Sequence, residues 1–403
     1  CERAVDQRPA GCWIDPRQTG PPQVTPRHGR AMPGRDGQTP PTVMKEVPAG
    51  SFVREWQNDL TANARGEIDR IHLLGDSLVV MTDRNQAFVF DTLEGTIRFS
   101  RAVARPEEQL LPPVRINDLF GFPLRGTINV YNRSGQLVKE TTIGRALNSP
   151  PFAQEELLFA GTITGSQGRL STIAPLKRYR NIINDVAIGL IESRPVFFDG
   201  ITYAGTVEGR VYAIASGRDA AWATPGYFQA GDSIRAALKA DSFALYVASL
   251  DSKLYALDRA TGRIRWQYFG QGALDTPPFI ADQYVYQMLS GDRLAAIRKR
   301  GPSNLREAEW EADGVQQVVA AGEDYVYVVL TNGRLAGLDV ETGQVAFTTQ
   351  REDLVLFAEN EQDDSIYAVT RDGRVMSIRP QLKRGGFGEI VRADLKPSLP
   401  VVR

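Results

Sequence analysis

Residues 244–266 read ALYVASLDSKLYALDRATGRIRW, and a close copy, YVYVVLTNGRLAGLDVETGQVAF, occupies residues 325–347. In both stretches two apolar runs flank a short polar turn, and a Thr-Gly pair then leads into a third run that ends in an aromatic residue. Alternation of apolar and polar residues over a few positions, bounded by Gly, Asp or Asn, is typical of β-strands. Each stretch is therefore predicted to form three antiparallel strands joined by tight turns.

The same pattern recurs along most of the chain at a nearly constant spacing. The residue that closes the second strand of each copy is, in order, Asp91, Asn132, Pro175, Ala215, Asp258, Arg298, Asp339 and Arg379, at steps of 40 to 43 residues. A period of this length with about four strands is that of a β-propeller blade, whereas an α-solenoid would repeat its apolar residues every 3.6 positions. We expect an all-β, eight-bladed β-propeller of four-stranded antiparallel blades with a period of about 41 residues.

The two ends of the repeat array complement each other. An aromatic residue stands eight positions after the closing residue in three copies, at Phe99, Trp266 and Phe347. If the repeat is extended by one period before the first copy, the position of the outer-strand aromatic residue falls near Trp56. The strand at residues 52–56 is therefore an outer strand that has no inner strands before it in the sequence. The last copy, which ends near Ile378, lacks such a strand. The N-terminal strand should therefore complete the last blade and remove the edges that an open ring would expose.

Residues 1–50 differ in composition from the rest of the chain. They contain nine of the 24 prolines, six glycines and almost no apolar periodicity. A segment of this kind cannot bury enough surface to offset its ordering entropy. We therefore divide the chain into a Pro-rich tether at residues 1–50 and a propeller at residues 51–403. The alternative is an N-terminal arm that folds against its own domain.

The first residue, Cys1, precedes this tether. A cysteine in this position is what the maturation of a bacterial lipoprotein leaves, so Cys1 is the predicted site of lipid attachment. A disulfide to Cys12, or an arbitrary first residue, is the alternative. Glu2 in place of Asp favours delivery to the outer membrane over retention in the inner membrane. The predicted location is the cell envelope, with the chain lipid-anchored at the periplasmic face of the outer membrane.

Charge and reactive side chains limit the possible functions. Lys and Arg together number 47 against 48 Asp and Glu, a formal charge of −1, so no nucleic-acid partner is expected. The histidines, His28 and His72, and two cysteines within the first 12 residues do not supply a zinc site. The GDSL sequence at residues 75–78 matches a hydrolase motif but has no downstream histidine to activate its serine. We expect no enzyme activity, no metal, no cofactor and no small-molecule substrate.

The run LYALDxxTGxxxW at residues 254–266, with weaker versions at 211–222 and 335–347, resembles the repeat of PQQ-type quinoprotein propellers. Together with Cys1 and the eight repeats, the chain from residue 51 to about 380 resembles the BamB family, propeller lipoproteins of the bacterial outer-membrane β-barrel assembly machinery. A quinoprotein dehydrogenase would imply a catalytic Asp, a calcium site and usually a vicinal cysteine pair beside the cofactor. Both cysteines here precede the propeller, so PQQ is not expected.

The resemblance also implies a partner and a contact region. In the BamB family, loops between neighbouring central blades contact the POTRA domains of the barrel protein, BamA, and the matching segments here are residues 187–195 and 231–235. The family's Leu-x-Leu-Arg order is not reproduced in them. In the alternative interpretation, Ile188, Leu190 and Ile191 simply form an inter-blade strand that packs in the core. The candidate partner-binding residues are Leu190, Ile191, Arg194 and Asp232.

The sequence thus favours a non-catalytic, periplasm-facing lipoprotein scaffold that mediates protein–protein contacts in outer-membrane β-barrel assembly. One alternative is a structural lipoprotein subunit of another envelope or membrane complex, which would use the propeller as a docking platform. A second alternative is a periplasmic quinoprotein or ligand-binding propeller.

Overall fold

The computed structural model describes residues 51–381, apart from 179–181, 216–219, 224, 302 and 350, all within one compact unit of the chain, Val47–Arg403. Every regular element in this part of the chain is a β-strand, and none of its residues forms a helix that could span a membrane. The predicted tether at residues 1–50, with the predicted lipid-attachment site Cys1, lies outside the described residues.

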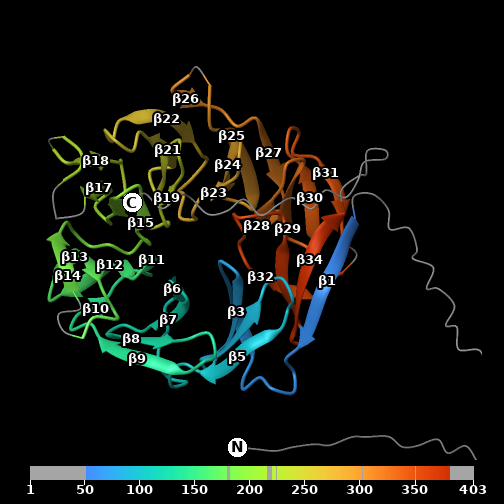
Figure 1. The fold of residues 1–403 in the computed structure, drawn as a ribbon. Helices are drawn as coiled ribbons and strands as arrows, with labels where there is room; N and C mark the ends of the chain where they lie inside the picture. The colour runs from blue at the N-terminus through green and yellow to red at the C-terminus, as the bar shows by residue number, and fades with distance from the viewer. Residues whose placement is uncertain are drawn as a thin grey trace, which may run out of the picture. The chain divides into compact units, whose positions relative to one another are not determined.

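The strands form eight sheets, which stand as the blades of a ring (Figure 1). The first four blades consist of β2 (Ile68–Leu74), β3 (Ser77–Thr82), β4 (Gln86–Asp91) and β5 (Ile97–Ala102) in blade 1; β6 (Val114–Ile116), β7 (Leu119–Pro123), β8 (Thr127–Tyr131) and β9 (Leu137–Thr142) in blade 2; β10 (Ala146–Leu147), β11 (Phe152–Gln154), β12 (Leu157–Thr164), β13 (Gln167–Ile173) and β14 (Ile182–Ala187) in blade 3; β15 (Val196–Phe198), β16 (Ile201–Gly205), β17 (Arg210–Ala215) and β18 (Tyr227–Gln229) in blade 4.

The other four blades consist of β19 (Lys239–Ala240), β20 (Leu245–Ser249), β21 (Lys253–Leu257), β22 (Ile264–Phe269) and β26 (Leu305–Arg306) in blade 5; β23 (Phe279–Ile280), β24 (Tyr284–Leu289), β25 (Arg293–Arg298) and β27 (Trp310–Asp313) in blade 6; β28 (Val315–Ala321), β29 (Tyr325–Leu330), β30 (Leu335–Asp339) and β31 (Val345–Thr348) in blade 7; β32 (Leu354–Phe357), β33 (Ile366–Thr370), β34 (Arg374–Gln381) and β1 (Ser51–Asp59) in blade 8.

The predicted all-β, eight-bladed propeller is therefore confirmed. Six blades have the expected four strands, and two depart from that plan. In blade 3 the inner strand is broken into β10 and β11, which both pair with β12. In blade 5 the short β26 adds a parallel partner to the outer strand β22.

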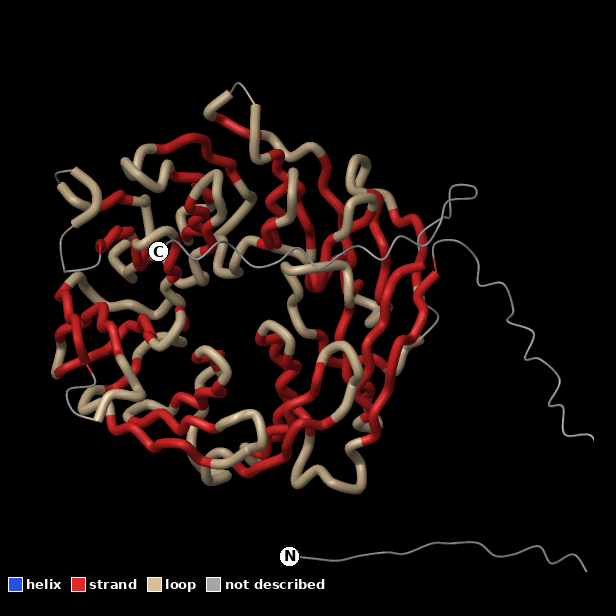
Figure 2. The backbone as a smooth tube through the Cα atoms, viewed as in Figure 1, coloured by secondary structure: helices blue, strands red, loops and turns tan. Residues whose placement is uncertain are grey.

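The strands of each blade run from the inside of the ring outward, so their loops divide between two faces (Figures 1 and 2). Because successive strands are antiparallel, one face carries the loops that lead from the outer strand of one blade to the inner strand of the next. The same face, called here the entry face, also carries the hairpins between the second and third strands. The remaining hairpins lie on the opposite face.

The N-terminal strand β1 closes the ring. It pairs antiparallel with β34, so that Phe52 lies opposite Pro380, Trp56 opposite Ser377 and Asp59 opposite Arg374. The predicted completion of the last blade by the N-terminal strand is confirmed. As a result, blade 8 is held by strands from both ends of the repeat array, and β34 is no longer an exposed edge.

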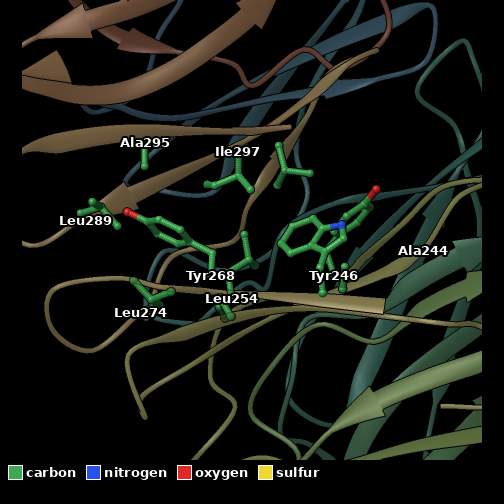
Figure 3. Close-up of a cluster of buried hydrophobic side chains, with 13 residues drawn as sticks. Ala244, Tyr246, Leu254, Tyr268, Leu274, Leu289, Ala295 and Ile297 are labelled. Atoms are coloured by element: carbon green, nitrogen blue, oxygen red, sulfur yellow. The ribbon is translucent and has the colours of Figure 1, made fainter. Parts of the chain in front are cut away.

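Aromatic side chains join most blades to the next. Trp266 of β22 packs in a buried cluster that includes Tyr246 of its own blade and Ile297 of blade 6, the latter two labelled in Figure 3. Four indole N–H groups donate to a backbone carbonyl of the following blade: Trp56 to Thr92 at 2.8 Å, Trp222 to Arg259 at 2.7 Å, Trp266 to Lys299 at 2.9 Å and Trp310 to Val340 at 2.7 Å. A buried Trp is stabilised most when its N–H finds such an acceptor.

The Thr-Gly turns of the repeat are shaped to receive these rings. Gly262 has φ of +70°, and a Cβ atom added to it would lie 2.6 Å from the ring of Trp222. Glycine is needed here for two reasons. The left-handed backbone conformation is strained for other residues, and the Trp222 ring leaves no space for a side chain. The Thr-Gly signature therefore reflects blade-to-blade packing.

Candidate functional site

The two segments suggested by the sequence lie next to each other on the entry face. The loop at residues 188–195 leads from β14 to β15, and the loop at residues 230–238 leads from β18 to β19. The hairpin at residues 206–209 lies between them, because Val207 N donates to Leu190 O at 3.0 Å and Ile234 N donates to Thr206 O at 3.1 Å. These backbone hydrogen bonds make the three loops one continuous surface, which we call the blade 4–5 platform.

Leu190 and Ile191 have different environments on this platform. Leu190 is half-buried, so part of its side chain faces solvent. Ile191 is only 1% exposed, and its Cβ atom would lie 2.7 Å from a Cβ added to Gly161. Its carbonyl also accepts a hydrogen bond from Asn148 Nδ2 at 2.9 Å. Ile191 is therefore a core residue of the joint between blades 3 and 4, as the alternative interpretation of the sequence held.

The platform also carries charged side chains. Asp232 is exposed, and its Oδ1 atom accepts a hydrogen bond from the backbone N–H of Ser233 at 2.6 Å, which fixes the carboxylate relative to the loop. Glu192 and Arg235 form an ion pair of 3.6 Å between the two entry loops, with side chains 41% and 56% exposed. An apolar side chain among oriented charges is the composition expected of a protein-binding surface with a polar rim.

Arg194 lies apart from these residues, along the inner strands. Its guanidinium stands over the ring of Phe152 at 5.3 Å from the centroid. Together with Lys239 and Glu361, it lines a cavity of about 430 Å³. Water reaches the side chain, yet protein surrounds it closely enough that burial lowers its pKa, while Glu359 and Glu361 oppose that shift. The structure therefore places Leu190 and Asp232 on linked loops of the platform, whereas the guanidinium of Arg194 faces the cavity beside Phe152.

Lys239 of the inner strand β19 and the loop after β32 form an ion cluster that the sequence did not reveal. Lys239 Nζ lies 2.7 Å from Glu359 Oε1 and 2.9 Å from Glu361 Oε1. Burial alone would lower the pKa of Lys239, but the two carboxylates outweigh it and raise that pKa above its usual value. Glu361 also accepts a hydrogen bond from the backbone N–H of Ile280 at 3.1 Å. These residues come from blades 5, 6 and 8, and no local motif links positions so far apart in sequence.

The residues considered for chemistry have structural surroundings. Ser77 of the GDSL sequence is fully buried, and the preceding Asp76 is paired with Arg98, Arg115 and Arg133 at 3.0 to 3.1 Å. His72 lies within β2, and its Nε2 atom is buried without a hydrogen-bond partner. Within the described part of the chain, no group of three or more His, Cys, Asp or Glu side chains is placed to hold a metal ion.

Two of the similar solved structures share the propeller architecture. The crystal structure of BamB from Moraxella catarrhalis superposes with a TM-score of 0.62 at 16% sequence identity, covering 84% of this chain and 100% of that one. The computationally designed Ika8 protein superposes with a TM-score of 0.57 at 14% identity, covering 78% of this chain and 96% of that one. At these identities the likeness concerns the fold alone.

Sequence comparison gives the family. No curated protein sequence matches the chain. A family model described as outer membrane protein assembly factor BamB matches residues 151–268 and 216–384, which together make up more than half of the chain. The chain therefore belongs to the BamB family of PQQ-repeat propellers.

Proposed function

We propose that this protein is a non-catalytic scaffold of the cell envelope that takes part in outer-membrane β-barrel assembly by binding a membrane assembly complex through the blade 4–5 platform. The observation that carries the proposal is that a partly exposed Leu190 and an oriented Asp232 stand on linked loops of one surface in a BamB-family propeller. POTRA domains of a BamA-like barrel protein are the partner that the family suggests.

The construction of the platform suits a scaffold. Its loops are held by backbone hydrogen bonds within and between blades, and Leu250 N of blade 5 extends the network by donating to Ser233 O at 3.0 Å. Loops fixed in this way lose little conformational freedom when they bind, so more of the contact energy appears as affinity. The partly exposed Leu190 would supply apolar burial, and Asp232, Glu192 and Arg235 would supply charge pairing at the rim.

The test is a double substitution on the platform, Leu190→Glu with Asp232→Lys. We expect it to release the partner from native protein purified out of detergent-solubilised envelope, with co-purification reduced at least about tenfold and the melting temperature changed by no more than a few degrees. Identification of the released partner by mass spectrometry would distinguish a barrel-assembly complex from another envelope complex.

The matched control is Leu93→Glu with Glu94→Lys, in the turn between β4 and β5. Leu93 is 84% exposed, and this turn lies on the face opposite the platform. The control makes the same chemical changes and should leave co-purification at the wild-type level. If the platform variant retains every partner at wild-type yield, the contact lies elsewhere on the protein.

A further inference from the structure

The aromatic residue that joins blades occupies one register position in several outer strands. Trp266 lies opposite Ala256, Phe99 opposite Val89 and Phe347 opposite Gly337. In each pair the outer strand has a β-bulge, because the residue just before the aromatic one has no partner on the third strand. These rings, with Trp56, Trp222 and Trp310, contact the following blade in six of the eight joints. The bulge fixes the direction of the side chain, which explains why the position recurs.

Two blades have no aromatic residue at this position. In blade 2 it is Lys139, opposite Val130, and in blade 3 it is Asn184, opposite Thr172, each with the same bulge. The long side chain of Lys139 still bridges its joint, because Nζ donates to the backbone carbonyl of Lys177 in the next blade. Asn184 is too short to fill the space that an indole or phenyl ring takes in the other joints.

A cavity of about 350 Å³ lies at the joint between blades 3 and 4, with Asn184 in its wall. The wall of the cavity also includes Phe159, Thr172, Phe197 and Ile214. The pair Phe159–Thr172 in blade 3 corresponds to the pair Tyr246–Ala256 in blade 5. In the third strand of the following blade, Ile214 is the last residue but one, and Ile297 has the same place in blade 6. Tyr246, Ala256 and Ile297 belong to the cluster that holds Trp266 (Figure 3). The cavity thus lies where the other joints hold a ring.

We propose that this joint cavity binds an aromatic side chain, tryptophan in preference to phenylalanine, presented by an extended segment of a partner polypeptide. The filled joints define the chemistry of the ligand, since the same wall positions there enclose a ring. Phe159 and Phe197 stack at 5.1 Å between centroids and offer a flat apolar wall. Burying an aromatic ring against such a wall is favourable both for the area removed from water and for ring–ring contact.

The mouth of the cavity adds a preference for positive charge in the ligand. Glu155 lines the cavity, is exposed and has no ion-pair partner among the described residues. The neighbouring Asp185, by contrast, is neutralised by Arg145 and Arg169, each at 2.6 Å. A basic residue next to the aromatic residue of the ligand would therefore find an uncompensated carboxylate. The joint cavity does not share residues with the blade 4–5 platform, so each proposal stands without the other.

The test measures binding of a short, acetylated, fluorescently labelled peptide with a central tryptophan and a lysine on either side. We expect fluorescence anisotropy to show saturable binding to the full chain, and a peptide with alanine in place of tryptophan to bind at least about tenfold more weakly. Substituting Asn184→Trp should fill the cavity from within, abolish binding of the tryptophan peptide and raise the melting temperature.

Two further variants make the result decisive. Lys139→Trp places the same ring at the equivalent position of blade 2, where the cavity is not involved, and should leave peptide binding unchanged. Asn184→Leu fills part of the space and should weaken binding even if Asn184→Trp does not fold. Equal binding of the tryptophan and alanine peptides, or undiminished binding by folded Asn184→Trp or Asn184→Leu, would overturn the proposal.

Discussion

Burial controls the charge of His72. Its Nε2 atom is shielded from water and has no hydrogen-bond partner, so the protonated ring is poorly solvated. This burial, followed by the positive charges of Arg70 and Arg194, lowers the pKa of His72 from 6.5 to about 4, and the carboxylate of Asp69 only partly opposes them. The folded protein therefore holds this imidazole neutral across a range in which the unfolded chain protonates it.

The stability of the protein should decrease as the pH falls from about 6.5 to about 4. In this range the unfolded chain binds a proton at His72 and the folded chain does not, so the free energy of unfolding falls, by on the order of 3 kcal/mol in total. Urea denaturation at a series of pH values should show a shallower decrease in His72→Gln. Because the carboxylates remain in both proteins, the difference between the two curves isolates His72, and parallel curves would contradict the assignment.

The candidate partner-binding residues show which features of a site can be predicted from the sequence and which cannot. The family resemblance pointed to two loops, and the structure places these loops, with Leu190 and Asp232, on one surface. Ile191 is adjacent to Leu190 but points into the joint with Gly161, a choice set by tertiary packing that the irregular loop does not encode in its alternation. Lys239 and Glu361 could not be paired from the sequence, because their proximity depends on closure of the whole ring.

The element β1 shows why the fold itself was predictable. Its role followed from the spacing of Trp56 relative to the repeats, and that spacing reflects a local requirement, an aromatic ring on a glycine turn. Counting eight residues from the closing residue Pro175 gives Ile183 as the joint position of blade 3. The strand register instead assigns this joint position to Asn184, opposite Thr172. The difference of one residue reflects where the bulge between β13 and β14 lies, and the gap that Asn184 leaves in the joint emerges only from the assembled blades.

Removal of β1 should destabilise the ring far more than removal of the segment before it. Without residues 1–49, β1 remains paired with β34, so the melting temperature should stay close to that of the full chain. Without residues 1–60, Phe52 and Trp56 leave their contacts with Phe347 and Thr92, at a cost of at least about 3 kcal/mol. Thermal melts of the two truncated proteins test this, and equal melting temperatures would show that β1 does not close the ring.

At the scale of the whole molecule, blade 8 is tied to the rest of the ring from the inside as well as through β1. The loop at residues 358–365 follows the inner strand β32, and Asn360 N donates to Val319 O of blade 7 at 2.8 Å. One residue further, Glu361 reaches Ile280 of blade 6 and Lys239 of blade 5. A single loop thus connects four consecutive blades and holds blades 5 to 8 together on the inside of the ring.

Replacing Lys239 with methionine should weaken this internal connection. The substitution leaves Glu359 and Glu361 close together without their shared cation, in surroundings where burial already raises the pKa of Glu361. Because water reaches these side chains in part, we expect a loss of about 1–3 kcal/mol, less than for a fully buried pair. Urea denaturation should show this loss for Lys239→Met, and a triple variant that adds Glu359→Gln and Glu361→Gln should recover much of it, because no unpaired charge remains.

A surface pair on the platform provides the comparison for this prediction. Arg235 and Glu192 lie 3.6 Å apart with exposed side chains, so Arg235→Met should cost no more than about 1 kcal/mol. The two substitutions remove the same kind of interaction, and only Lys239 joins blades that are not neighbours. A larger loss for Lys239→Met than for Arg235→Met is therefore the signature of a connection across the ring. Equal losses would mean that the inner cluster is solvated like any surface ion pair and adds no special connection between blades 5 and 8.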